Sequence, residues 1–327
     1  MERIYILDMI NLHKQLQLRG HNYSLEELEE WKEIASSPLS YKYMAIKKPD
    51  GKKRYLQAPD EPLKRLQRAI IDCIGPMIRP YVSYGVYKPV SPRHLRRDWV
   101  ENGRWHQGRR VIVKMDIKEF FPSTTVTKYI NGIYSLDIIS HREEHQILEK
   151  TLEEIVDLVF IKPSIALPYL PTGAPTSPIV SDIAFKPVDV AIVRYLNAFR
   201  EQTIYYSRYV DDLTFSMCSY PKGFQRIINE IASMHHWKLN HKKSQLLYTG
   251  QDKAIVTGIN MQSPCGVNKK ERGKLRAMLH QYALSGKPLD SVAQGRLQLI
   301  RRSNLTMYQG LLNYYDKTRE KYESQRK

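Results

Sequence analysis

The chain has 327 residues, of which 51 are Lys or Arg and 34 are Asp or Glu, so its formal net charge is +17. This length allows a substantial core and two or three subdomains, and the charge indicates an acidic polymer as partner or, more simply, a basic surface. The first residues lack the basic segment and the long apolar run of a secretory signal, so we expect none. The longest uncharged stretch, 163–181, contains five prolines, so we do not expect it to form a membrane-spanning helix. Three cysteines without metal-type spacing (Cys73, Cys218 and Cys265) predict reduced, buried thiols in a cytoplasmic protein.

The first predicted element is a helix over 25–34, because SLEELEEWKEI opens with Ser24 as N-cap and continues with an apolar stripe. Strands are predicted over 41–46 and 52–57, on either side of turn residues at 49–51. Five basic residues surround this hairpin: Lys47, Lys48, Lys52, Lys53 and Arg54. Such a hairpin is either a solvated edge or a finger that grips phosphate.

A helix over 63–74 is stopped by prolines, and an irregular segment rich in Tyr, Pro and Arg runs from there to about residue 110. Its arginines alternate with Trp99 and Trp105, a mixture suited to phosphates and stacked bases. An ordinary charged loop is the alternative interpretation.

Further along, periodicity predicts a buried strand over 111–117, helices over 147–159 and 179–199, and a strand, hairpin and strand over 204–216. From residue 273 onward the chain is helical, tyrosine-rich and basic. Five cations there could meet a nucleic-acid backbone: Lys274, Arg276, Arg296, Arg301 and Arg302. Helices and antiparallel strands together predict an α+β fold.

The sequence Tyr209-Val210-Asp211-Asp212 places two adjacent acids at a hairpin tip inside an apolar context. Like charges so close must be neutralised by cations or keep a proton, so the pattern indicates a metal. Asp116 ends the strand VIVKMD and supplies a third carboxylate. Three such oxygen ligands are typical of a site that holds two Mg²⁺ ions for phosphoryl transfer.

The motifs MDIKEFFPS, LPTGAPTSPIVSD, RYVDD and LNHKKS occur in the order and approximate spacing of the palm motifs of reverse transcriptases, over roughly 52–258. Two further elements, Asn-Gly-Arg-Trp-His at 102–106 and Val-Thr-Gly at 256–258, resemble those of bacterial retron reverse transcriptases. The chain departs from the family pattern at Thr172, where a Gln is usual, and at Gly103, where an Ala is usual.

The resemblance implies an α+β right-hand polymerase fold with an antiparallel palm sheet and a helical C-terminal thumb. We expect the N-terminal helix and fingers in 1–110, the palm in 111–250, and the primer grip and thumb in 251–327. The implied activity is RNA-directed DNA synthesis on a cognate structured noncoding RNA, which gives branched multicopy single-stranded DNA. The implied partners are that RNA, dNTPs and a separate effector protein in defence against phage, with no membrane.

The resemblance also assigns residues around the nucleotide. Arg54 resembles the fingers residue that meets the incoming triphosphate, although a surface arginine flanked by other cations is equally consistent. Phe121 resembles the steric gate that excludes a ribose 2′-hydroxyl, with a plain core phenylalanine as the alternative. Gly173 resembles part of the loop that supports the template and the nascent pair.

Lys243 resembles the lysine that protonates departing pyrophosphate, and a solvated lysine is the alternative. His106 either orients RNA or completes a local hydrogen-bond network. Four further residues are expected at the RNA by resemblance: Asn102, Val256, Thr257 and Gly258.

The implied mechanism has one Mg²⁺ held by Asp116 and Asp211 and a second on the triphosphate, with Asp212 in a more structural role. Two other functions stay open from the residues alone. One is a catalytically idle RNA-binding scaffold, and the other is an untemplated or DNA-copying polymerase like those of some phage-abortive relatives.

Overall fold

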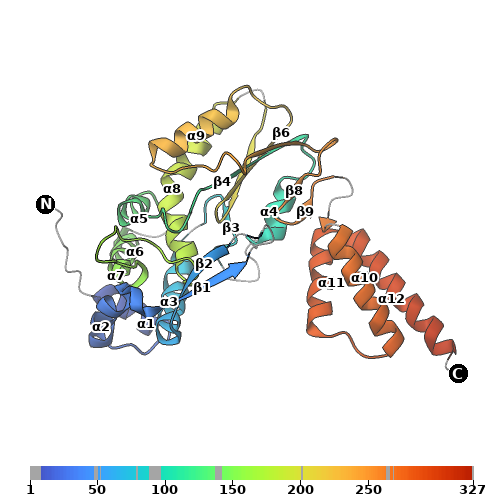
Figure 1. Cartoon of the computed structure of the whole chain (residues 1–327), viewed down its shortest axis with the longest axis horizontal. Helices are drawn as coiled ribbons and strands as arrows, with labels where there is room; N and C mark the ends of the chain where they lie inside the picture. The colour runs from blue at the N-terminus through green and yellow to red at the C-terminus, as the bar shows by residue number, and fades with distance from the viewer. Residues whose placement is uncertain are drawn as a thin grey trace.

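The computed structural model describes residues 9–47, 51, 53–78, 80–87, 97–136, 142–199, 202–262, 266–267 and 269–325. The first helices, a long hairpin and a helix-covered sheet form one body, and the last three helices form a lobe beside it (Figure 1). The helices are α1 (Ile10–Leu18), α2 (Leu25–Ser36), α3 (Glu61–Ile74), α4 (Trp99–Trp105), α5 (Val126–Ile133), α6 (Arg142–Glu154), α7 (Val156–Val159), α8 (Ser177–Leu196), α9 (Phe224–Met234), α10 (Lys269–Ser285), α11 (Ser291–Ser303) and α12 (Leu305–Gln325). The strands are β1 (Tyr41–Lys47), β2 (Lys53–Pro59), β3 (Ser83–Tyr84), β4 (Val111–Asp116), β5 (Tyr205–Tyr209), β6 (Asp212–Met217), β7 (Gln245–Tyr248), β8 (Ile255–Val256), β9 (Ile259–Asn260) and β10 (Gly266–Val267).

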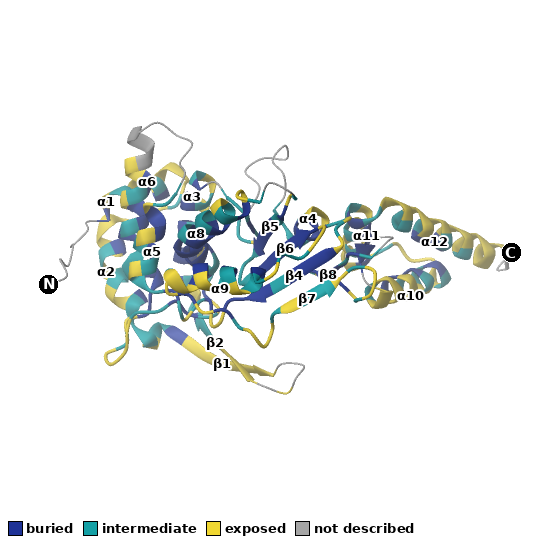
Figure 2. Ribbon diagram, turned by 90° about the horizontal axis from the view of Figure 1, so that it is seen from above, coloured by how far each residue is buried: buried dark blue, intermediate teal, exposed yellow. Residues whose placement is uncertain are grey.

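The central sheet has five strands in the order β3-β5-β6-β4-β7. The pairs among β5, β6, β4 and β7 are antiparallel, as expected, and the short edge strand β3 pairs with β5 in parallel. The hairpin β1–β2 is a separate antiparallel ribbon, and both of its strands lie where the sequence predicts them. Most of the hairpin is exposed (Figure 2).

The two faces of the central sheet have different chemistry, because successive side chains of a strand point to opposite sides. On one face, Val111, Val113 and Met115 of β4 join the main hydrophobic core. On the other face, the same strand carries Ile112, which belongs to a second core, and then Lys114 and Asp116. The end of β4 therefore presents a carboxylate on the face opposite to the main core.

Helix α8 is the centre of the main core. Its buried residues lie on all sides of the helix, as in a helix with no solvent face. Helix α5 crosses it at Gly132, where an added Cβ would lie 2.6 Å from the carbonyl carbon of Ile183 and 2.9 Å from Cα of Ala184. Only a glycine lets the two backbones approach this closely.

The N-terminal helices pack on this core through specific end contacts. Ser24 caps α2, and with Glu27 it forms a complete capping box, which confirms the helix start expected from the sequence. Helix α1 was not predicted. Its first turn is held by the buried carboxylate of Glu154, which accepts from the backbone N–H groups of Asn11 at 3.2 Å and Leu12 at 2.6 Å.

A second hydrophobic core joins the C-terminal lobe to the rest of the protein. Val100 of α4 and Val256 and Ile259 of the β8–β9 turn pack with Leu275, Leu279 and other residues of α10–α12. Buried hydrophobic residues from Met9 to Ile78 and from Val111 to Leu239, apart from Ile112, form the main core instead. The domain boundaries at 110/111 and 250/251 stay a prediction.

Three details differ from the sequence-based expectations. A short helix, α4, lies inside the segment expected to be irregular, because Asp98 caps it through Val100 and Glu101. The helix expected over 147–159 is interrupted at Ile155 and divides into α6 and α7. Cys218 is exposed, so the expectation of a buried thiol is wrong there, whereas Cys73 is buried. Cys265 lies outside the described residues.

Among the residues that the structure describes, no helix combines the length and the apolar character that crossing a bilayer requires.

We predict that Gly132→Ala destabilises the protein, because the new methyl group would overlap the α8 backbone, which cannot rotate away. Overpacking of this kind costs about 1–3 kcal/mol, and the free energy of unfolding from denaturant titration measures it. Gly310→Ala in α12, where nothing lies within 4 Å of the added methyl, is the matched control and should be neutral or slightly stabilising. Equal stabilities for the two variants would contradict the close α5–α8 crossing.

Candidate active site

Of the three acids predicted from the sequence, two lie on neighbouring strands, β4 and β6. The third lies in the turn that joins β5 to β6. Asp116 ends β4 and is the antiparallel partner of Asp212, the first residue of β6. Asp211 precedes Asp212 in the two-residue turn that joins β5 to β6. The register alone therefore brings the backbones of Asp116, Asp211 and Asp212 together at one corner of the sheet.

The β5–β6 turn is held in an unusual backbone conformation. Val210 has a φ of 57°, a left-handed value that is rare for a β-branched residue. The carbonyl of Asp211 accepts a hydrogen bond from the Ile117 N–H at 3.0 Å, just past the end of β4. This bond ties the turn to the strand that carries Asp116.

Lys243 reaches the same corner from the turn that follows Leu239. The Asn240 N–H donates to the Asp116 carbonyl at 2.7 Å, and the Lys243 Nζ donates to Asp116 Oδ1 at 2.7 Å. The Asp116 carboxylate raises the pKa of Lys243 through this hydrogen bond, so the ammonium is held protonated. The lysine side chain is 58% exposed, whereas Asp116 is almost buried.

Burial dominates the protonation of the other two acids. It raises the pKa of Asp211, and the neighbouring charge of Asp116 raises it further. Burial and the charge of Asp211 raise the pKa of Asp212 to about 6. The site thus holds more negative charge than its surroundings accept readily, which is the condition for binding cations.

The donor set fits hard divalent cations, because all three acids offer carboxylate oxygens. As the side chains stand, however, no three acidic, histidine or cysteine groups among the described residues are gathered closely enough to hold a metal ion. The ammonium of Lys243 takes the place of a cation on Asp116 instead. The backbone register fits a metal centre, and side-chain rotation is needed to complete it.

Two of the residues expected at the nucleotide lie on elements that meet at the fingers. The Arg54 guanidinium in β2 lies close enough for its charge to lower the pKa of Asp211, against the effect of burial. Gly173 has a φ of 128°, and its Cα faces the Gln57 backbone of the same strand. Because the Gln57 N–H donates to the Thr172 carbonyl at 2.7 Å, the loop that contains Gly173 holds the hairpin that carries Arg54.

Phe121, for which the sequence leaves a steric gate and a core residue open, lies next to a second phenylalanine, Phe120. Phe120 is 4% exposed and packs against Phe185 and Trp237, so it is the core residue. Phe121 is only partly buried at the edge of this cluster. A gate function for Phe121 stays a prediction.

The two retron-type elements are hydrogen-bonded to each other, and Asn102, His106 and Val256 are buried, whereas Trp105 and Gly258 are exposed. Asn102 accepts from the Ser207 hydroxyl at 2.6 Å and donates to Thr257 at 3.3 Å. His106 bridges Ser207 at 2.7 Å and Ser216 at 2.8 Å, and burial lowers its pKa to about 3, so it is neutral.

Val256 is fully buried as well, and Gly258 faces the Trp99 ring. A Cβ at Gly103 would lie 2.6 Å from Ile259 Cγ1, so this position of the chain requires a glycine. In this conformation Asn102, His106 and Val256 cannot touch RNA directly, and any effect on RNA would come through the position of α4. Their assignment to RNA binding stays a prediction.

The sequence analysis did not identify Arg208, Asp182 and Asp189 as site residues. Arg208 lies on the main-core face of β5, is 1% exposed, and pairs with Asp182 at 2.6 Å and Asp189 at 2.7 Å, both on α8. Its other guanidinium nitrogen donates to the Val210 carbonyl at 2.9 Å. An arginine immediately before the Tyr-Val-Asp-Asp run, in a strand without any other charged residue, was the available signal.

Comparisons with known proteins show which family the sequence matches. The family model for "Reverse transcriptase (RNA-dependent DNA polymerase)" matches residues 46–265. The chain is 29% identical to the retron Mx65 reverse transcriptase of Myxococcus xanthus over 75% of this chain and 56% of that protein. It is 24% identical to the retron Ec86 reverse transcriptase of Escherichia coli over 88% and 84% of the two chains. The chain thus spans little more than half the length of the first of these relatives.

Among solved structures, the telomerase of Candida albicans in complex with a fragment of telomeric RNA matches with a TM-score of 0.45 and 13% identity. That match covers 87% of this chain and 61% of the telomerase chain. A likeness at this level supports no argument about function.

We predict that Asp212 makes the metal-free protein less stable as the pH rises. An unfolded aspartate ionises near pH 4, whereas folded Asp212 keeps its proton up to about pH 6. Between these values the folded state binds more protons, so stability falls as pH rises and the loss is complete above pH 6. The Tm of Asp212→Asn minus that of the wild type should therefore grow from pH 4 to pH 7 in EDTA.

The matched control is Asp316→Asn, which changes an exposed acid on α12. Its Tm difference from the wild type should show no such growth over the same range. A constant difference for Asp212→Asn would contradict the raised pKa.

Proposed function

Because the chain belongs to the reverse transcriptase (RNA-dependent DNA polymerase) family, we propose that it copies RNA into DNA with Asp116, Asp211 and Asp212 at its catalytic centre. The observation that carries the proposal is the register that pairs Asp116 with Asp212 beside Asp211. The match of the family model to residues 46–265 supports it, since it includes all three acids.

We infer that Mg²⁺ is the metal and that two ions act. Asp116 and Asp211 would hold one ion, the second would bind with the triphosphate, and Asp212 would have a more structural role. The metal would supply activation of the attacking sugar hydroxyl and neutralisation of charge at the departing pyrophosphate. The chain's own residues have separate tasks. Arg54 meets the triphosphate from the fingers, and Lys243, held protonated, gives a proton to the leaving pyrophosphate. Phe121 screens the sugar, and Gly173 lets the supporting loop approach β2 closely.

We further propose that the template is a cognate structured noncoding RNA and that the product is branched multicopy single-stranded DNA, made in the cytoplasm. Support comes from relatives named as retron reverse transcriptases and from the elements at 102–106 and 256–258. A role in defence against phage, with a separate effector protein, belongs to the same proposal.

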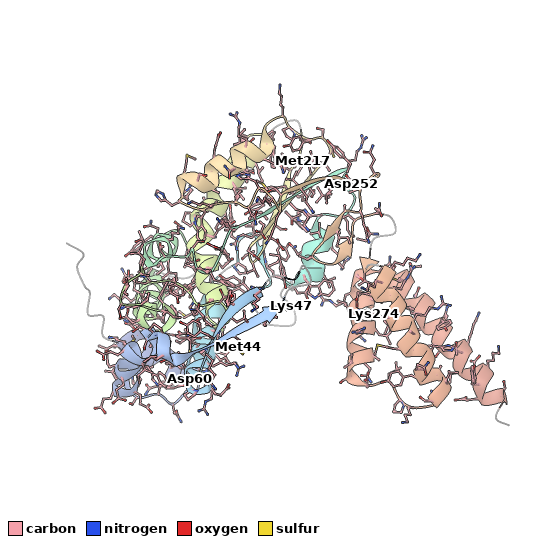
Figure 3. All side chains as sticks on the ribbon, viewed as in Figure 1. Met44, Lys47, Asp60, Met217, Asp252 and Lys274 are labelled. Atoms are coloured by element: carbon pink, nitrogen blue, oxygen red, sulfur yellow. The ribbon has the colours of Figure 1, made fainter. Side chains whose placement is uncertain are left out.

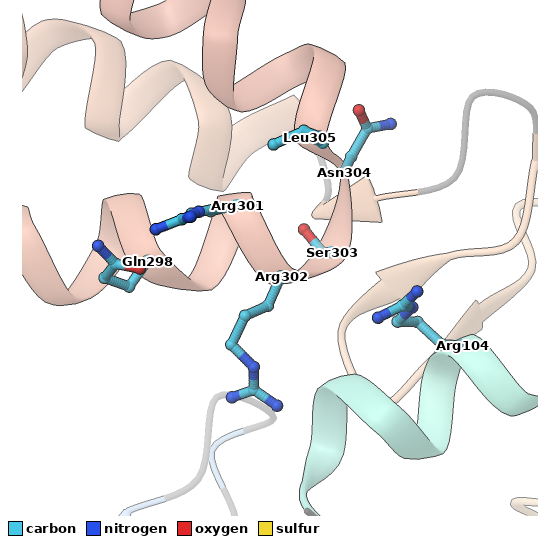
Figure 4. A pocket seen from close by; sticks show the side chains of 7 residues that line it. All are labelled: Arg104, Gln298, Arg301, Arg302, Ser303, Asn304 and Leu305. Atoms are coloured by element: carbon cyan, nitrogen blue, oxygen red, sulfur yellow. The ribbon is translucent and has the colours of Figure 1, made fainter.

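The C-terminal lobe offers a surface for that RNA. Lys274 and other cations lie on its helices, across from the basic hairpin end marked by Lys47 (Figure 3). Between α4 and the corner from α11 to α12 is a cavity of about 480 Å³ (Figure 4). Its lining includes Arg104, Arg301 and Arg302, of which Arg302 already pairs with Asp98 at 2.6 Å. Arg104 also pairs with an acid, Glu101, at 3.5 Å, whereas the Arg301 guanidinium lies over the Tyr308 ring, so Arg301 is the arginine that a phosphate would meet.

We predict that Asp211→Asn reduces DNA synthesis at least about a thousandfold while RNA binding is unchanged, because the variant loses a metal ligand and keeps the basic surface. The protein would be purified with its bound nucleic acid from its native host and supplied with dNTPs and Mg²⁺. Wild-type product that remains attached to RNA after protease treatment supports the retron activity. Full synthesis by Asp211→Asn would contradict the assignment of the catalytic centre.

Two other outcomes of this experiment point to the alternative functions. Bound RNA without any synthesis by the wild type would favour an RNA-binding scaffold. Synthesis that continues after the RNA is removed would favour an untemplated polymerase.

We predict that Arg301→Gln weakens RNA binding and lowers the slope of log K against log salt by about 0.7–0.9, the effect of losing one phosphate contact. Filter binding of the cognate RNA at salt concentrations from about 50 to about 300 mM would measure this slope, because log K falls linearly with log salt. Arg226→Gln, on the exposed face of α9, is the matched control and should keep the wild-type slope. An unchanged slope for Arg301→Gln would exclude this cavity as a phosphate site.

A further inference from the structure

Arg208 lies directly beneath the turn that carries the catalytic acids. We propose that Arg208 is a positioning residue: with Asp182 and Asp189 it clamps the Val210–Asp211 turn and so fixes where the carboxylates stand. This inference rests on the proposed function, because it gives the clamp a task in DNA synthesis.

The contacts of Arg208 use all three of its guanidinium nitrogens. Nε donates to both oxygens of Asp189, at 3.2 and 3.3 Å, and Nη2 donates to Asp189 at 2.7 Å and Asp182 at 2.6 Å. Nη1 is left for the Val210 carbonyl at 2.9 Å. The two acids therefore fix the plane of the guanidinium, and the third nitrogen holds the turn.

The turn needs such a restraint, because Val210 is in the left-handed region and a β-branched residue leaves that region readily when nothing holds it. Both carbonyls of the turn accept a hydrogen bond. Val210 O is bound by Arg208 from the core, and Asp211 O is bound by the Ile117 N–H at the end of β4. With both carbonyls fixed, the Asp211 and Asp212 side chains leave the backbone in set directions.

The acids of the clamp connect the turn to other parts of the site. Asp182 and Asp189 are seven residues apart on α8, which puts them on one face of the helix. The loop with Gly173 leads directly into this helix. Asp182 also accepts from the Tyr87 hydroxyl at 2.7 Å and from Ser83 at 3.1 Å, and the Tyr206 hydroxyl donates to Asp189 at 2.6 Å.

A purely stabilising ion pair would not account for this arrangement. Taking an arginine and two aspartates out of water is costly, and packed apolar residues often replace such clusters without loss of stability. One acid would suffice to neutralise one arginine. The second acid fixes the orientation of the guanidinium, and the bond to a main-chain carbonyl transmits that orientation to the turn.

The experiment compares Arg208→Lys and Asp189→Asn with Glu154→Gln in the full-length protein with its RNA. Lysine keeps the charge and cannot hold two acids and a carbonyl together, and asparagine keeps the shape of Asp189 and removes its charge. Glu154→Gln is the matched control, because Glu154 is also buried and hydrogen-bonded and serves the first turn of α1.

Three quantities are measured: kcat and KM for dNTP, the rise in Tm that Mg²⁺ produces, and the Tm without metal. We expect Arg208→Lys and Asp189→Asn to lower kcat at least tenfold with KM within about twofold, and to halve the Mg²⁺-induced rise in Tm. Glu154→Gln should lower the metal-free Tm and leave kcat and the response to Mg²⁺ as in the wild type.

A wild-type kcat and Mg²⁺ response in either clamp variant would overturn the proposal, whatever happens to its metal-free Tm. If Arg208→Lys does not fold, the kcat and the Mg²⁺ response of Asp189→Asn test the proposal. Absence of synthesis in the wild type would count against the proposed function instead, and the Mg²⁺-induced shift in Tm would still test whether the clamp positions the acids.

Discussion

The antiparallel pairing of Asp116 with Asp212 is the constraint on which the rest of the site depends. It places two carboxylates on neighbouring strands and a third, Asp211, in the turn beside them, although their charges repel. The surrounding residues reduce this repulsion between the carboxylates. The Lys243 ammonium pairs with Asp116, and the charge of Lys114 acts on Asp212 against the effect of burial. These interactions allow the sheet to close with its acids in register.

The same sheet face links the acids to the C-terminal lobe. Ser207 and Ser216 are buried there and need partners, which His106 of the α4 C-terminus supplies. The last residues of α4 are held in this way. At its other end, Val100 packs in the second core and Asp98 pairs with Arg302 of α11. Two small hydroxyl residues in the central strands therefore anchor the end of α4, and α4 in turn contacts the C-terminal helices.

The sequence predicted well what depends on local periodicity and on motif order. The N-cap at Ser24, the strands β1, β2, β4, β5 and β6, and the meeting of the three acids at one corner of the sheet follow from patterns within a few residues. It did not predict α4, because the seven residues of this helix are stabilised by the Asp98 cap and by packing on Ile259 and Val256 far along the chain. The partners of Arg208 could not be found either, since the pairing depends on how α8 lies across the sheet. Burial of Asn102 and His106 likewise requires the fold.

The hydrogen bond between Lys243 and Asp116 connects charge balance with the proposed proton transfer. A divalent cation on Asp116 would compete with the ammonium for the same oxygens, and the largely exposed lysine can swing away into solvent. The bond to Asp116 is what raises the pKa of Lys243, so its loss brings the pKa back toward the ordinary value and makes the ammonium a stronger acid. In the proposed mechanism, Lys243 would leave Asp116 when a metal is bound there, and it would then be free to protonate the leaving pyrophosphate. A lysine fixed more deeply at Asp116 would exclude the metal, and one held farther away would leave the acids unpaired when no metal is bound.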